Sequence, residues 1–181
     1  MIYGDDGNLY VAGYTTEIGS NQDFTVISID TAGQERWVYS YDGPGNGDDA
    51  GYFLSFDAAG NLNIAGYTTG LSNCKNFTVI NLDTAGNEHW VCKYQGIGNG
   101  NGLANSIVCA ADSTIFSAGH SPGNNGVRQI TVISLGPLGD VKESVCRTIP
   151  EAGCLEVYPN PLRDYTAVSY THLRAHETVL D

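Results

Sequence analysis

The stretch "AGYTT" occurs at Ala12–Thr16 and again, 53 positions later, at Ala65–Thr69. The same offset relates Trp37 to Trp90. At this offset "DFTVISIDTAGQERWVYSY" (residues 23–41) aligns without a gap to "NFTVINLDTAGNEHWVCKY" (residues 76–94). The chain is therefore a tandem repeat, and each copy is expected to form one supersecondary unit.

A degenerate third copy follows at the same spacing. It supplies "STIFSAGHS" (residues 113–121) and "QITVISLGPLGDVKESV" (residues 129–145), and Gly119 stands 53 positions after Gly66. The tryptophan is lost in this copy, where Glu143 occupies its register.

Four strands are predicted within each period. In the second copy they cover residues 51–56, 62–68, 77–82 and 88–94, each a run of β-branched or aromatic residues between turn residues. The turns "DAAGN" and "DTAG" combine an Asp side chain, which binds nearby backbone amides, with a Gly that accepts positive φ. With 23 Gly, 11 Tyr and 1 Met in 181 residues, the composition agrees with an all-β protein.

Four antiparallel strands per period, repeated in tandem, are typical of β-propeller blades. The segments "GNLYVAGYTT" and "DFTVISIDTAGQERWVYSY" resemble the β-propeller repeat of secreted bacterial proteins (SBBP-type), from Asp5 to about Val145. The resemblance implies a partial blade at residues 1–47, a complete blade at 48–100 and a degenerate blade at 101–145. Since the first copy starts at "GNLYVAG", we expect it to lack one strand. We therefore expect the chain to be an incomplete propeller fragment from the C-terminal end of a longer protein.

The C-terminal part has a different character. After an expected linker at residues 146–154, "LEVYPNPLRDYTAV" resembles the opening of the C-terminal sorting domain of Bacteroidota proteins exported by type IX secretion, with the motif residues Tyr158, Pro159, Asn160 and Pro161. A generic proline turn is the alternative. The resemblance implies a truncated sorting domain at residues 155–167. Residues 168–178, "VSYTHLRAHET", resemble a translated sequencing adaptor, so we expect residues 168–181 to be non-native.

The charge and hydropathy of the chain limit its partners. With 20 acidic and 8 basic residues, the net charge of -12 disfavours nucleic acid and anionic membranes, and no apolar run is long enough to span a bilayer. The resemblances imply a secreted or cell-surface protein that meets the type IX secretion machinery and an unknown protein or glycan ligand.

Two candidate metal sites are weak. The acidic loop "DGPGNGDD" at Asp42–Asp49 would offer oxygen ligands to calcium, but it lacks the ligand spacing of an EF-hand and favours a solvated connection. His172 and His176 are spaced as in zinc hydrolases, but no Glu stands between them as a general base. We therefore expect no resident cofactor, with calcium as the only alternative.

Other side chains favour structural roles. Tyr14, Tyr67, Trp37 and Trp90 would suit a carbohydrate-binding face, but their recurrence favours packing between blades. His89 and His120 lack acidic or Cys partners in the sequence. The five cysteines form no CxxC pair and no regular spacing, so we expect mostly ordinary thiols, with a Cys146–Cys154 bridge as an open alternative.

No nucleophile elbow or Cys–His–Asn pattern stands in a persuasive context, so no catalytic residue is predicted. The leading hypothesis is a non-catalytic propeller module with a structural or binding role. The alternatives are an accessory propeller of a secreted peptidase or glycan-degrading enzyme, and a propeller that catalyses with residues of further blades.

Overall fold

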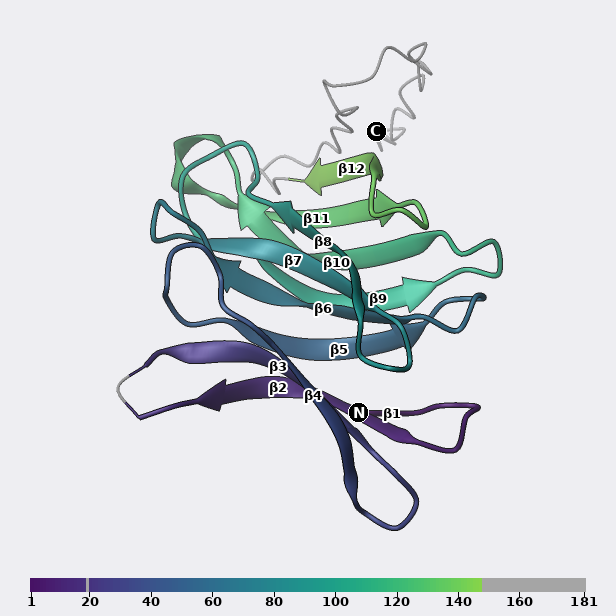
Figure 1. The fold of residues 1–181 in the computed structure, drawn as a ribbon. Coiled ribbons are helices and arrows are strands. Elements are labelled where there is room, and N and C mark those ends of the chain that lie inside the picture. The colour runs from purple at the N-terminus through teal and green to yellow at the C-terminus, as the bar shows by residue number, and fades with distance from the viewer. Residues whose placement is uncertain (19, 148–181) are drawn as a thin grey trace, which may run out of the picture.

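The computed structural model describes residues 1–18 and 20–147. These residues form three four-stranded antiparallel sheets in chain order, stacked face to face (Figure 1). The only helix among them is a single 3₁₀ turn, Asn124–Gly126. The described residues are all-β and form propeller-type blades in tandem, which confirms the predicted fold class.

The strands follow one another without crossovers. The first blade contains β1 (Ile2–Tyr3), β2 (Leu9–Thr16), β3 (Gln22–Ile29) and β4 (Glu35–Tyr41). The second contains β5 (Ala50–Phe56), β6 (Leu62–Thr69), β7 (Lys75–Leu82) and β8 (Glu88–Tyr94). The third contains β9 (Leu103–Cys109), β10 (Ile115–Pro122), β11 (Arg128–Leu135) and β12 (Val141–Arg147).

The strand registers repeat with the sequence. Gly13 pairs with Thr25 and Gly66 with Thr78, and the third blade keeps the same pair. The last strand of each blade is also in register, because the partners of Trp37, Trp90 and Glu143 are Ser28, Asn81 and Ser134. A shift of 53 residues therefore maps one blade onto the next, as predicted.

The two ends of the repeat array differ from the sequence predictions. The strand expected to be missing from the first blade is present as β1, in which Ile2 pairs with Tyr10 and Tyr3 with Leu9. At the other end, β12 continues to Arg147 and so takes in the start of the expected linker. The rest of that linker, the expected sorting-domain start and the tail from residue 168 lie outside the described residues.

The repeated turns explain why the strands end where they do. Asp57 Oδ1 accepts the backbone N–H of Ala59 at 2.9 Å, and Gly60 adopts a φ of +83°. The same arrangement closes the β3–β4 and β7–β8 hairpins, through Asp30 with Gly33 and Asp83 with Gly86. Each of these three hairpins is thus stabilised by hydrogen bonds within its own turn.

The core lies between blades. One cluster joins the first and second blades, and its buried members are Tyr10, Phe24, Val26, Leu62, Ile64, Ile80 and Leu82. A second cluster joins the second and third blades, and its members include Ala65, Phe77, Val79, Ile115, Ile133 and Leu135. The second blade is covered on both faces, and every residue of β6 is buried.

Candidate functional site

The contact between the first two blades shows which side chains pack together where one blade meets the next. Tyr10 is fully buried, and its ring meets Phe56 edge-on with centroids 5.4 Å apart. At the next contact the equivalent pair is Asn63 and Cys109, where the Asn63 amide donates to the sulfur at 3.5 Å. Each interface therefore pairs matched residue types at the same two positions.

The tryptophans dock on the next blade in the same way. Trp37 Nε1 donates to the Thr84 carbonyl at 3.0 Å, and Trp90 Nε1 donates to the Pro137 carbonyl at 3.0 Å. Both accepting carbonyls belong to hairpin turns of the following blade. The two indoles occupy equivalent positions, as predicted, and both are partly buried.

Each docked indole lies over a turn glycine. A methyl group added at Gly86 would lie 2.8 Å from Cδ2 of Trp37, and one at Gly139 would lie 2.5 Å from Cδ2 of Trp90. Both glycines also have a positive φ, +87° and +76°. The carbonyl and the bare glycine together form what we call an indole seat.

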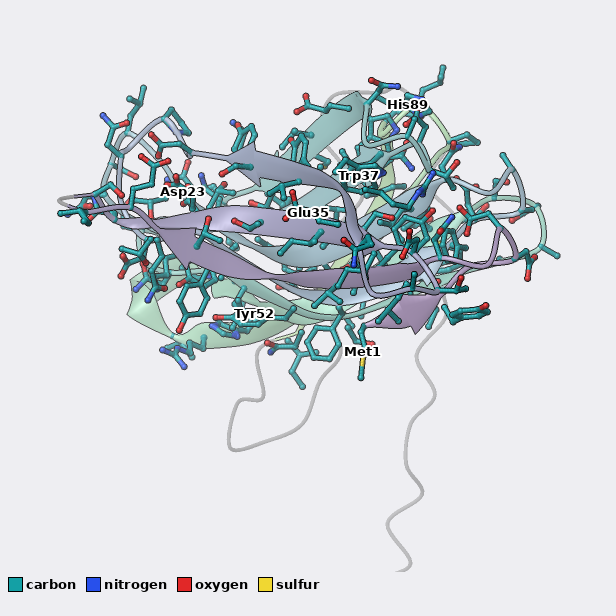
Figure 2. All side chains as sticks on the ribbon, turned by 60° about the horizontal axis from the view of Figure 1, so that its bottom comes forward. Met1, Asp23, Glu35, Trp37, Tyr52 and His89 are labelled. Atoms are coloured by element: carbon teal, nitrogen blue, oxygen red, sulfur yellow. The ribbon has the colours of Figure 1, made fainter. Side chains whose placement is uncertain are left out.

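The face of the first blade that points away from the second blade carries the same residue types as the face of the second blade that packs on the first. Its residues are Leu9, Val11, Gly13, Thr15, Ile27, Ile29 and Val38, and the second-blade equivalents are Leu62, Ile64, Gly66, Thr68, Ile80, Leu82 and Val91. We call the first set the open face; Figure 2 brings its blade to the front. Val38 is 48% exposed, and a hollow of about 160 Å³ lies against Val11 and Ile27.

A pair of hydroxyls supports this equivalence. Thr68 Oγ1 and Thr78 Oγ1 lie 2.9 Å apart in the buried interior of the second blade. In the first blade, Thr15 Oγ1 and Thr25 Oγ1 lie 2.7 Å apart, with Thr15 exposed. The open face therefore keeps the hydroxyl pair of a buried interface, although Thr15 and Val38 are exposed and its other apolar side chains are half-buried.

The acidic loop acts as a connection between blades. Asp49 is fully buried and accepts backbone N–H groups from Thr69, at 2.5 Å, and from Gly43. Its own N–H donates to the Gln22 carbonyl of the first blade at 2.7 Å. Burial raises the pKa of the Asp49 carboxyl, and the nearby charge of Asp42 adds to the rise.

This geometry gives no support to the calcium alternative. The most buried carboxylate of the loop is engaged with backbone amides. Within residues 1–18 and 20–147, no group of three or more His, Cys, Asp or Glu side chains has a geometry that could hold a metal ion.

A second concave region lies beside the β6–β7 connection. It has a volume of about 400 Å³ and is lined in part by Leu71, Ser72, Asn76 and Lys93. The Oδ1 atom of Asn76 is buried there without a hydrogen-bond partner. Lys93 Nζ, however, already donates to the Tyr41 hydroxyl at 2.9 Å, so the charged group of this groove is engaged in the contact between the first two blades.

The remaining candidates take structural positions. His89 Nδ1 lies 2.9 Å from Asn81 Oδ1, and the Asn81 amide donates to Asn63 at 2.8 Å, which links three polar side chains of the second blade. Burial lowers the pKa of His120, and the Arg128 charge lowers it further. Burial raises the pKa of the Cys92 thiol to about 11.

The proposed aromatic face does not form one platform. Tyr67 is 5% exposed, whereas its equivalent Tyr14 is 53% exposed, and the two tryptophans serve different blade contacts. Several predicted residues lie outside the described part of the chain: the motif Tyr158–Pro161, Cys154, His172 and His176.

The fold defines a class: an all-β repeat protein of propeller-type blades in tandem. No family model matches this chain, and the search of curated proteins finds no similar one. No helix within the described residues is long and apolar enough to cross a membrane.

The sequence predicts Thr31, Gly33 and Glu35 only as turn and strand residues, although they are the equivalents of the contact residues Thr84, Gly86 and Glu88. Their signal was present, because "DTAG" at residues 30–33 repeats at 83–86. This pattern indicates a hairpin turn, and the contact of such a turn with an indole of another blade is not visible within one repeat.

Proposed function

We propose that this chain is a non-catalytic repeat module of a secreted or cell-surface protein, and that it binds a β-sheet partner through the open face. The observation that carries the proposal is that the open face is equivalent to the face of the second blade that packs on the first blade. Leu62, Ile64 and Ile80 are fully buried there, and the same apolar types stand at Leu9, Val11 and Ile27. An apolar face of this kind favours association.

Export is the second part of the proposal. The sequence motif Tyr158–Pro161, at the end of the repeats, supports delivery by type IX secretion. Because the expected sorting domain is truncated at residue 167, the reporter carries residues 146–167 followed by the remaining strands of a type IX sorting domain. In a bacterium with that system, this reporter should reach the outside of the cell. The same reporter with alanine at all four motif positions should be retained; equal export of both would contradict the assignment.

The binding role can be tested on the full chain. A second copy of residues 1–53 placed ahead of Met1 continues the repeat register and brings Ala50–Phe53 in front of β1. The control carries a Gly/Ser segment of equal length. If the open face receives a blade, the added copy should raise the Tm by at least about 4 °C over the control. Equal Tm values would overturn the binding role.

A further inference from the structure

The β3–β4 turn of the first blade has the geometry of the two indole seats. Asp30 N–H donates to the Gln34 carbonyl at 2.9 Å and Gly33 N–H to the Asp30 carbonyl at 3.0 Å. The corresponding distances in the occupied β7–β8 turn are 2.9 and 3.1 Å. Gly33 has a φ of +78°, close to the +87° of Gly86.

This turn differs from the occupied turns in what covers it. A methyl group added at Gly33 would meet no atom within 4 Å, whereas at Gly86 and Gly139 it would strike an indole. Thr31, the equivalent of Thr84, is exposed. The carbonyl and the bare glycine of a third indole seat therefore stand at the edge of the open face.

A second recognition group lies beside this seat. At the contact between the first two blades, the Tyr39 hydroxyl donates to Glu88 Oε2 at 2.5 Å. Tyr39 stands two residues after Trp37, so one strand delivers both groups. The equivalent of Glu88 in the first blade is Glu35, which is exposed at the start of β4 (Figure 2).

We propose that the open face recognises a blade-type β-sheet whose last strand carries the pattern Trp-x-Tyr. The indole ring covers Gly33 and donates its N–H to the Thr31 carbonyl, and the tyrosine hydroxyl donates to Glu35. This inference rests on the proposed binding function and names its partner. Aromatic side chains that also bear a hydrogen-bond donor are well suited to such an anchoring role.

A second copy of this chain does not meet the requirement. Its third blade has Glu143 at the tryptophan register position, opposite Ser134. Its tryptophans Trp37 and Trp90 are already docked within their own chain. The partner is therefore a different blade, one that supplies its own indole.

The chain with the added copy of residues 1–53 tests the inference, since that copy brings a Trp-x-Tyr strand. In this chain, changing the added Trp37→Glu should remove at least half of the Tm gain over the Gly/Ser control. Tyr39→Phe in the added copy should remove a smaller part. A full Tm gain with Trp37→Glu would overturn the inference while leaving the binding role intact.

Two glycine variants of the original chain form a matched pair for testing the indole seat. Gly33→Ala and Gly60→Ala change turn glycines with φ of +78° and +83°, and neither added methyl meets an atom within 4 Å. The two changes should lower the Tm of the original chain equally. When the added copy is docked, Gly33→Ala in the receiving blade should cost at least about 3 °C more than Gly60→Ala.

Glu35→Ala avoids the turn altogether. It should leave the Tm of the original chain within about 1 °C and should lower the Tm of the chain with the added copy. When the added copy carries Tyr39→Phe, Glu35→Ala should no longer lower the Tm. Equal costs of Gly33→Ala and Gly60→Ala in both chains would overturn the seat. A dimer of the original chain that Gly33→Ala disrupts would overturn the choice of partner.

Discussion

Single residues explain why neighbouring blades fit in one order. Tyr10 with Phe56 and Asn63 with Cys109 fill the same two positions at successive contacts, one with two aromatic rings and one with an amide and a thiol. An exchange at only one of these positions would leave a cavity or an unpaired polar group. The repeat is therefore uniform in its backbone and specific in its contacts.

Asp49 shows the cost of a buried connection. Its carboxyl is stabilised by two backbone N–H groups, yet the loss of water and the charges of Asp42 and Asp23 disfavour the ionised form. The net result is a pKa above the ordinary value of 3.8. Folding therefore favours the protonated carboxyl, and this stabilisation is lost as the pH rises through the raised pKa.

The pH dependence of stability should reveal this residue. From pH 4 upward, the free energy of unfolding should decrease as Asp49 ionises, because the unfolded chain keeps the ordinary pKa. Asp49→Asn should flatten this part of the profile, whereas Asp48→Asn should preserve it. Urea unfolding at several pH values measures the difference; parallel profiles for Asp49→Asn and the unchanged chain would contradict the assignment.

At the scale of strands and turns, most of the fold could be predicted from the sequence. The strand β8 was predicted at its observed bounds, and β6 to within one residue, because β-branched runs and Asp–Gly turns are local signals. The two-residue strand β1 escaped prediction because Ile2–Tyr3 is too short to show alternation. The third indole seat escaped because it depends on contacts between blades.

The two hydroxyl pairs test how much burial increases the contribution of a hydrogen bond to the stability of a blade. Thr68→Val removes a hydroxyl from the buried pair with Thr78, which keeps its bond to the Asn76 carbonyl at 3.0 Å. The change should cost about 1 kcal/mol. Thr15→Val, the equivalent change on the open face, should cost less because Thr15 is exposed in the folded chain.

Denaturant unfolding of the two variants measures both costs. The comparison is matched, because Thr15 and Thr68 occupy the same register position next to Thr25 and Thr78. A larger loss for Thr15→Val would show that the two faces are not equivalent. In the chain with the added copy, where the open face is covered, Thr15→Val in the receiving blade should approach the cost of Thr68→Val.

At the scale of the whole molecule, each blade is stabilised mainly by its neighbours. The second blade is covered on both faces, whereas the first exposes Val38 and the third exposes Phe116 and Ile130, which are 48%, 41% and 53% exposed. In such a stack the stability is close to a sum of blade terms and contact terms. Local opening should therefore cost most in the second blade and least in the outer ones.

Hydrogen exchange followed by mass spectrometry should resolve this gradient. Backbone amides of β6 and β7 should exchange more slowly than the equivalent amides of β2 and β3, although the strand registers match residue by residue. The comparison removes sequence-dependent bias, since Phe24–Ile27 and Phe77–Ile80 share the same four residues. Placing the added copy on the open face should slow exchange in β2 and β3 of the receiving blade and leave β6 and β7 nearly unchanged. Equal protection of both strand pairs before any addition would show that the blades open as one cooperative unit, and that the open face carries no local deficit for a partner to repair.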